Sequence, residues 1–490
     1  MYNNPLMVLR EYVQNAVDAI ELAEREEILP RNAGTVSVTI DGQHRQIVIE
    51  DNGIGLKSAT ATTLLGGVGL SSKRFGDARG FRGIGRLGGL GYADELCFET
   101  RSVQQDFVQV VCWNVTKLQT YLRNRRGHVS LAEAIKAAVR VSKRAPHKTE
   151  GSHFFRVTLR HVRRFHRDDL LNIERVATYL SRVAPIPFRS DDFPFAEKVD
   201  EYLSAVDGYR CFTVELNGRR LYRPHRRAFG DGPKKADEIH DVTLFEIPGP
   251  NGCVIGRGWH AKTNCIASLP SSVTMRGVKV RQGNIEIGDE YFLAEWFTER
   301  RFATWHIGEL HVDYQLRANA RRDGFEEGEA FEALLEYSTR MCRQLSKQCR
   351  QSSLQRTQRL RLERGLDQME KVVSEETLVV DKAHLKQKQA LLLTEIAAFT
   401  KLAAKLKSNG MYTPRLEKLQ TRVGRLRQRS QSLRDQLDGR KLRPYKAPER
   451  LKDLLVSVAV DIVKYHDDQD HVRAERLVRQ VMAPFSSVRE

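Results

Sequence analysis

Apolar residues recur every three or four positions over residues 5–27, and this spacing predicts one amphipathic helix. The positions that form its apolar face are Leu9, Val13, Ala16, Val17 and Ile20. Two runs of alternating polarity follow, 35–40 and 46–50, and predict the strands of a hairpin. By the same reasoning we expect strands at 96–101, 107–113 and 154–159, and a helix at 168–183.

A proline-rich segment, 184–195, predicts a boundary between two folded regions. Beyond it, a strand at 211–216 runs into Asn217-Gly218, a dipeptide that favours a tight turn. Further strands are expected at 242–247, 253–259, 273–281 and 307–314. We therefore expect a first domain over 1–195 and a second mixed α/β module over 196–335.

Long polar helices are expected after residue 326. One seam steps alternately by three and four residues, which is the pattern of a coiled coil with one polar position: Leu416, Leu419, Val423, Leu426, Ser430, Leu433 and Leu437. A second apolar row recurs every seven residues at Leu385, Leu392, Phe399 and Leu406. We predict an antiparallel helical hairpin over 336–445 with its tip at 408–414, and a helical tail over 446–490.

Composition changes this picture in two ways. The 490-residue chain has a formal net charge of +18, much of it within the predicted helix 340–364, which favours either a nucleic-acid or anionic partner or a solvated basic surface. The seven cysteines are scattered without a CxxC pair, so we expect neither a zinc site nor a disulfide framework, and a reducing cytoplasm as the default. No apolar run reaches about 18 residues, and no secretion signal is recognisable.

Candidate chemistry begins on the first helix. Glu11, Asn15 and Asp18 are spaced i, i+4 and i+7, so they share one face. On such a face Glu11 can orient and deprotonate a water, and the side-chain carbonyl of Asn15 can bind magnesium, which takes few protein ligands. Taken alone, the same residues are more typical of the polar side of an ordinary amphipathic helix.

Three glycine-containing segments add to this helix. Asp51, Gly53 and Gly55 follow a predicted strand, where a carboxylate can accept a hydrogen bond from an amine while the backbone passes close to a ring. Backbone N–H groups in the segment from Gly80 through Gly83 to Gly85 can face phosphate oxygens. This segment also fits GxGxxG, but no apolar strand leads directly into it, which excludes the dinucleotide fingerprint. The third segment, 150–152, ends in Ser152, whose hydroxyl can hold a water.

In order and spacing the four segments resemble the GHKL ATPases, the superfamily of gyrase, the ninety-kilodalton heat-shock chaperones, histidine kinases and MutL. The ExxxNxxDA motif matches Glu11 to Ala19, and DxGxG matches Asp51, Gly53 and Gly55. The glycine-rich lid and second glycine box match 66–69 and 80–85. A Gly-Thr ends the site in the family, and here Gly151-Ser152 keeps the hydroxyl.

The resemblance implies ATP and Mg²⁺ as cofactors, and a role for each matching residue. Glu11 would be the general base, Asn15 the magnesium ligand and Asp51 the partner of the adenine amine. The remaining residues expected to line the nucleotide are Asp18, Gly53, Gly55, Gly80, Gly83, Gly85, Arg86 and Ser152, together with Lys73 in the lid segment 64–79. Arg322, or else Arg321, resembles the chaperone arginine that reaches the γ-phosphate.

The implied fold is α+β: an N-terminal α/β-sandwich ATPase domain, a split βαβ middle module, and the helical hairpin and tail. The implied activity is slow ATP hydrolysis that drives lid and domain closure. The pattern at 71–74 favours a chaperone-like protein that remodels a protein partner. The segment 80–83 and the basic helical region favour a DNA-associated clamp similar to MutL or MORC proteins. In either case we expect a cytoplasmic protein, without membrane insertion, with a homodimer as one arrangement.

Overall fold

The computed structural model describes residues 4–67, 85–123, 130–164, 167–230, 237–264, 267–319 and 322–374, and helical positions between 386 and 431. The chain separates into two compact units, Met1–Ser353 and Leu354–Glu490. None of the described helices is long and apolar enough to cross a membrane.

The first sheet begins with the hairpin that the alternating pattern predicts. Strand β1 (Thr35–Asp41) pairs antiparallel with β2 (Gln46–Asp51). The other strands are β3 (Ala93–Arg101), β4 (Val108–Asn114), β5 (Val139–Arg144), β6 (Phe154–Val162), β7 (Thr213–Leu216) and β8 (Arg219–Arg220). Their order is β5-β4-β3-β6-β2-β1-β7-β8, and β7 lies parallel to β1. Residues beyond the predicted boundary at 195 therefore complete the first sheet.

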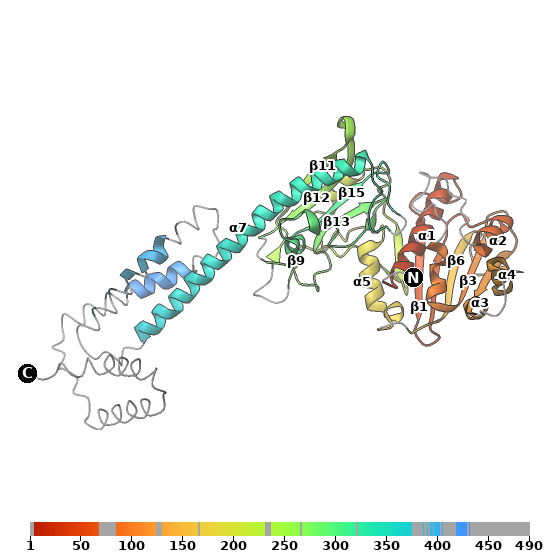
Figure 1. Ribbon diagram of the computed structural model, residues 1–490, viewed down its shortest axis with the longest axis horizontal. Coiled ribbons are helices and arrows are strands. Elements are labelled where there is room, and N and C mark those ends of the chain that lie inside the picture. The colour runs from red at the N-terminus through yellow and green to blue at the C-terminus, as the bar shows by residue number, and fades with distance from the viewer. Residues whose placement is uncertain are drawn as a thin grey trace, which may run out of the picture. The chain divides into compact units, whose positions relative to one another are not determined.

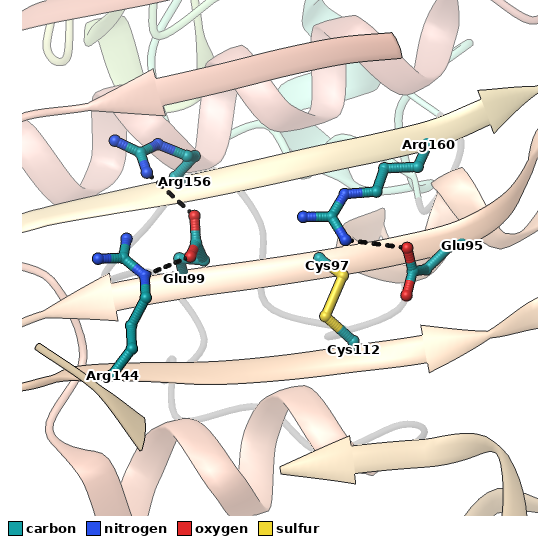
Figure 2. The surroundings of a disulfide bond; sticks show 7 residues. All are labelled: Glu95, Cys97, Glu99, Cys112, Arg144, Arg156 and Arg160. Atoms are coloured by element: carbon teal, nitrogen blue, oxygen red, sulfur yellow. Dashed lines mark hydrogen bonds and ion pairs between the residues drawn. A yellow bond between two sulfur atoms is a disulfide. The ribbon is translucent and has the colours of Figure 1, made fainter. Parts of the chain in front are cut away.

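Helices cover one face of this sheet (Figure 1). Helix α1 (Met7–Arg25) buries its apolar side, including Leu9, Val13 and Ile20, against the strands. The other described helices of this region are α2 (Ser58–Gly66), α3 (Val115–Arg123), α4 (Leu131–Ala138) and α5 (Ile173–Val183), with 3-10 turns η1 (Gly85–Gly91) and η2 (Asp169–Leu171). In the middle of β3, Leu96 and Phe98 belong to the core, so Glu95, Cys97 and Glu99 lie on the opposite face (Figure 2).

The second sheet has the order β11-β12-β15-β13-β14. Its strands are β11 (Asp241–Pro248), β12 (Val254–Lys262), β13 (Gly277–Gln282), β14 (Ile285–Ile287) and β15 (Ile307–Val312). Strands β13 and β15 are parallel, and the chain between them carries 3-10 turns η4 (Ala294–Trp296) and η5 (Arg300–Trp305) where the expected βαβ unit would have an α-helix. Near it lie α6 (Ala196–Leu203), η3 (Pro250–Gly252) and the two-stranded ribbon β9 (Ala228–Phe229) and β10 (Asp237–Glu238).

Helix α7 (Glu329–Ser374) is 46 residues long and begins on the second sheet (Figure 1). Leu334, Cys342, Leu345 and Cys349 are buried there at helical spacing, and Tyr337 stacks on Phe245. In the second unit the described part of the predicted seam, Leu419, Val423 and Leu426, is buried, as are Leu366, Ile396 and Phe399. The hairpin tip and the tail 446–490 lie outside the described residues.

The structure confirms the α+β fold class, with a sheet domain that precedes a helical C-terminal region. One expectation is wrong. Cys97 and Cys112 form a disulfide, although the cysteine spacing indicated none (Figure 2). The two residues are direct partners in the β3–β4 ladder, so strand register, rather than a local motif, brings them together.

Candidate functional site

The polar side of α1 carries the first group of candidate residues. Glu11 has a side chain that is 16% exposed, and Oε1 lies 3.4 Å from Nη2 of the buried Arg10. Asn15 and Asp18 are half-buried on the same helix face, one and two turns further along. The helix therefore presents three partly exposed polar side chains on one face, while its apolar side is fixed in the core.

The described end of the glycine box packs directly against this face. A Cβ added to Gly85 would lie 2.7 Å from Oε2 of Glu11, so only glycine leaves the carboxylate where it is. The buried Tyr12 fastens the following turn, because its hydroxyl donates to Arg86 O (3.0 Å) and accepts from Gly89 N (2.9 Å). Tyr12 was not singled out from the sequence, where it is one more large residue of an amphipathic helix.

The loop after β2 forms the other side of the site. Asp51 is buried and accepts a hydrogen bond from Gly53 N at 2.9 Å. Burial raises the pKa of Asp51 well above its usual value, more than that hydrogen bond lowers it. A Cβ on Gly53 would come within 2.6 Å of the Ala19 backbone, and Gly55 has a φ of 69° beside Arg101 O. Both glycines therefore let the loop pass close to α1 and β3.

Neighbouring strands hold this loop in place. Thr100 of β3 accepts from Leu56 N (2.8 Å) and donates to Phe154 O (3.1 Å). His153 Nδ1 lies 2.8 Å from Gly53 O, next to the exposed Ser152. The sequence places Thr100 in a predicted strand and His153 beside one, but it does not predict that they hold the loop. Their contacts depend on which strands pair.

Arg322 comes from the second module and is buried, with 6% of its surface exposed. Burial lowers the pKa of Arg322 to about 10, against the opposing effect of the charges on Glu11 and Asp18. Its backbone has a left-handed φ of 53°, and Nη1 has no hydrogen-bond partner among the described residues. The structure thus brings this cation into the electrostatic field of the two α1 carboxylates.

Ion pairs connect α5 to the second sheet. Arg182 near the end of α5 lies 3.3 Å from Glu286 and 2.8 Å from Glu290. Arg281 of β13 donates to the carbonyl oxygens of Arg182 and Ala184 and pairs with Glu309 at 2.9 Å. These last carbonyls of a helix attract a cation. A buried electrostatic joint, made of Arg182, Arg281, Glu286 and Glu309, therefore ties the first sheet region to the second.

Glu309 holds the centre of this joint. It pairs with both Arg223 and Arg281, and all three side chains are fully buried. Although burial acts to raise it, these two guanidinium groups hold the pKa of Glu309 well below its usual range. A buried carboxylate in this setting is strongly destabilising once either partner is removed.

Several predicted site residues lie outside the described residues: Lys73, Gly80, Gly83 and Arg321, together with most of the expected lid. Those that are described fall into two groups around α1. Glu11, Asn15, Asp18, Gly85 and Arg86 lie on α1 or beside it, and Asp51, Gly53, Gly55 and Ser152 belong to the β2 loop and the start of β6.

The arrangement fits a magnesium nucleotide by its own chemistry. Four features are present: a buried carboxyl, glycines whose space a Cβ would fill, an amide beside a carboxylate, and a buried arginine. Nη1 of that arginine has no hydrogen-bond partner in the part of the chain that the structure describes. When bound, Mg²⁺ neutralises phosphate charge. Asn15 would hold the metal, Asp51 would face the base, and the backbone around Gly85 would face phosphates.

Parts of this chain are similar to known proteins. Residues 2–139 match the family described as histidine kinase-, DNA gyrase B-, and HSP90-like ATPase. The chaperone protein HtpG of Acinetobacter baylyi is 34% identical over 119 residues, which span 21% of this chain and 19% of the chaperone. The crystal structure of the ATPase region of Saccharomyces cerevisiae topoisomerase II aligns with 70% of this chain and 84% of that chain, at a TM-score of 0.40 and 12% identity. The N-terminal segment 2–139 of this chain is therefore similar to the GHKL type of ATPase domain, and the segment that aligns with the chaperone spans about a fifth of the chaperone's length.

Proposed function

We propose that this protein is an ATP-hydrolysing conformational switch, in which Arg322 couples the presence of the γ-phosphate to the position of the second module. The proposal rests on the burial of Arg322. Burial lowers its pKa, the charges of Glu11 and Asp18 raise it, and Nη1 has no hydrogen-bond partner within the described residues. A buried guanidinium without a full set of acceptors is costly. A γ-phosphate near Glu11 would supply those acceptors, so ATP would favour the conformation in which Arg322 stays inserted.

Each residue then has one task in hydrolysis. Glu11 accepts a proton from the attacking water, and Arg10 beside it orients the carboxylate. Asn15 holds the magnesium ion, while Asp51 accepts from the adenine amine. Arg322 stabilises the charge that develops on the transferred phosphoryl group. Gly83, Gly85 and Arg86 would run along the phosphates, and Lys73 would belong to the closing segment.

The electrostatic joint gives this switch a mechanical output. Arg322 reaches the site from the second module, and Arg182 and Arg281 fasten the same module to α5. Release of phosphate removes the partner of Arg322. The electrostatic joint is then the remaining connection between the second module and the first sheet region. We infer that the second module is attached at two places before hydrolysis, through Arg322 and through the joint, and at the joint alone afterwards. This is an order–disorder type of switch.

The task of this switch is, in our proposal, chaperone-like remodelling of a protein partner in the cytoplasm, by a chain able to act as a homodimer. A DNA-associated clamp is the alternative. Its support is a stripe of exposed basic residues on α7 at Arg340, Arg343, Lys347 and Arg350. Glu336 and Glu299 lie within 4.0 Å of the first and last of these, which reduces the stripe's positive field.

Salt dependence separates the two tasks. A clamp that neutralises phosphates loses duplex-DNA affinity steeply between 50 and 200 mM salt, and reversing Arg343 and Lys347 to glutamate abolishes that affinity. A chaperone suppresses aggregation of an unfolded protein in an ATP-dependent, salt-insensitive manner. Salt-dependent DNA binding without suppression of aggregation would favour the DNA-associated clamp over the chaperone-like function.

The switch itself is tested with Arg322→Ala and the matched control Arg317→Ala, an exposed arginine five residues earlier. We expect Arg322→Ala to lower the rate of phosphate release at least tenfold while ADP affinity changes little, because Arg322 acts on the γ-phosphate. Glu11→Gln should abolish turnover and preserve ATP binding. Equal turnover by wild type, Arg322→Ala and Glu11→Gln would refute the proposal.

A further inference from the structure

The outer face of the first sheet carries a chemical group that ATP hydrolysis does not use. Cys97 and Cys112 lie directly opposite each other on β3 and β4, with 4.1 Å between their Cα atoms, and are joined as a disulfide (Figure 2). Cys97 is 1% exposed, whereas Cys112 is half-buried. Cys112 is therefore the more exposed of the two residues, and we take its sulfur as the point of attack for a reagent in solution.

We propose that this pair is a reversible thiol–disulfide exchange site for small thiols and disulfides of the glutathione class, and that its oxidised state strengthens nucleotide binding. The second half rests on the proposed function. In the reductive direction, the thiolate of the small thiol attacks Sγ of Cys112, and Cys97 leaves as a thiolate that takes up a proton. A second small thiol attacks the mixed disulfide, which releases Cys112 as a thiol and one small disulfide. Two thiols are oxidised and one protein disulfide is reduced.

Charged neighbours of the pair select the reagent. The carboxylate of Glu95 and both sulfurs lie within 4.8 Å of one another, and Arg160 Nη1 lies 3.0 Å from Glu95. Alone, Glu95 would repel an anionic thiolate, and Arg160 offsets that repulsion. Arg160 is 46% exposed, so it can also meet the carboxylates of glutathione.

The two cross-linked strands support different parts of the nucleotide site. On β3, Thr100 accepts from Leu56 N in the loop that follows Asp51. On β4, Trp113 is the neighbour of Cys112, and its Nε1 donates to Leu65 O at 2.8 Å near the end of α2. Gln109 of β4 also accepts from Ser58 at the start of α2. A bond between the strands therefore fixes the Asp51 loop relative to α2.

A redox titration of the full chain tests the exchange site. The chain is equilibrated over a range of reduced-to-oxidised glutathione ratios, alkylated and weighed by mass spectrometry. We expect the 97–112 peptide pair to pass reversibly from thiol to disulfide, and Arg160→Gln to slow exchange with glutathione more than with the uncharged dithiothreitol. Cys253→Ser, a half-buried cysteine on the second module, is the matched control and should leave the titration unchanged.

Nucleotide affinity tests the coupling. We expect ATP-analogue affinity to be about fivefold weaker in the reduced chain and in Cys112→Ser than in the oxidised chain, and linkage requires the analogue to shift the redox equilibrium by the same factor. Equal affinity in both redox states overturns the coupling. Absence of any nucleotide binding, with exchange intact, refutes the proposed function instead.

Two other results overturn the exchange site itself. The first is a pair that stays in one redox state at every glutathione ratio. The second uses zinc alone as the probe. If Zn²⁺ protects both thiols from alkylation and oxidation, and Glu95→Gln loses this protection, then Glu95, Cys97 and Cys112 form a metal site instead.

Discussion

The hydroxyl of Tyr12 joins α1 to Gly89 of the η1 turn, accepting from Gly89 N at 2.9 Å while it donates to Arg86 O at 3.0 Å. Tyr12→Phe keeps the ring and removes both hydrogen bonds. We expect a loss of about 2 kcal/mol in the free energy of unfolding, because each buried bond contributes about 1 kcal/mol. Chemical denaturation measures it.

The same change should raise the KM for ATP more than it lowers kcat, since the turn lies beside the proposed phosphate positions. Tyr121→Phe on α3 is the control and should alter neither quantity. A Tyr12→Phe protein that is less stable but has an unchanged KM would limit Tyr12 to folding.

Gly85→Ala should displace the carboxylate of Glu11, because the new Cβ would lie 2.7 Å from Oε2. The carboxylate is the flexible end of its side chain, so the fold survives while the proposed base moves. We expect kcat to fall at least tenfold with a smaller change in ADP affinity, measured by phosphate release and calorimetry. Gly42→Ala, where a Cβ would meet nothing within 4 Å, is the control. Unchanged turnover in Gly85→Ala would remove Glu11 from its proposed role.

Asp51→Asn should raise the thermal stability of the protein while it abolishes ATP binding. Burial raises the pKa of Asp51, so the native state holds its proton more tightly than the unfolded state does. The associated stability is therefore present at low pH and is lost as pH rises through the folded-state pKa. Asparagine has no such penalty, so we expect a gain in Tm that is larger at pH 8 than at pH 4, with loss of ATP binding.

Thermal denaturation across pH and calorimetry with ATP measure these two effects. Asp41→Asn is the opposite control, since hydrogen bonds with His44 lower the pKa of that carboxyl. Its stabilising effect is present above the unfolded-state pKa and is lost in acid. ATP binding by Asp51→Asn at wild-type affinity would contradict the assignment of Asp51 to the adenine amine.

His225 should make the second module sensitive to acid. It lies among Phe188, Phe193 and Trp259, neither ring nitrogen has a partner among the described residues, and burial lowers its pKa to about 3. Because the unfolded histidine takes up its proton first, stability falls as pH drops from about 6.5 towards 3, by about 1.4 kcal/mol per pH unit. His225→Phe should remove this dependence and be more stable than wild type at pH 5 by about 2 kcal/mol.

Urea denaturation at pH 5 and pH 8 measures the difference between the two proteins. His240→Phe, on a side chain that is 46% exposed, is the control. The acid sensitivity that remains in His225→Phe is expected from His306 and His311, because burial lowers their pKa values to about 3 and about 4. An unchanged pH dependence in His225→Phe would show that this histidine is hydrated.

The sequence was sufficient for features that depend on local periodicity. The α1 face and the β1–β2 hairpin follow from spacings of 3.6 and 2 residues, and the structure confirms both elements. The candidate residues Glu11 and Asp51 could be nominated because each belongs to a short motif. Their roles stay predictions.

Features that depend on pairing between distant segments escaped prediction. Cys97 and Cys112 meet only once the register of β3 and β4 is known, because a slip by a single residue would turn one of the two side chains to the other face of the sheet. Arg281 and Glu309 occupy strand positions that local reasoning assigns to solvent, yet each neutralises the other within the interior. Arg322 was nominated by resemblance alone, because nothing local shows that it reaches α1.

The pairing of β7 with β1 has a consequence for synthesis on the ribosome. Strand β1 is translated about 175 residues before its parallel neighbour β7. At a synthesis rate of about 5 to 20 residues per second, about 10 to 35 s pass before Val214 is made and can pair with β1. During that interval the nascent chain exposes an unpaired row of backbone donors and acceptors, the kind of edge that recruits other strands. The first sheet, which carries the candidate nucleotide site, thus depends for its own completion on the early part of the module that it is proposed to move.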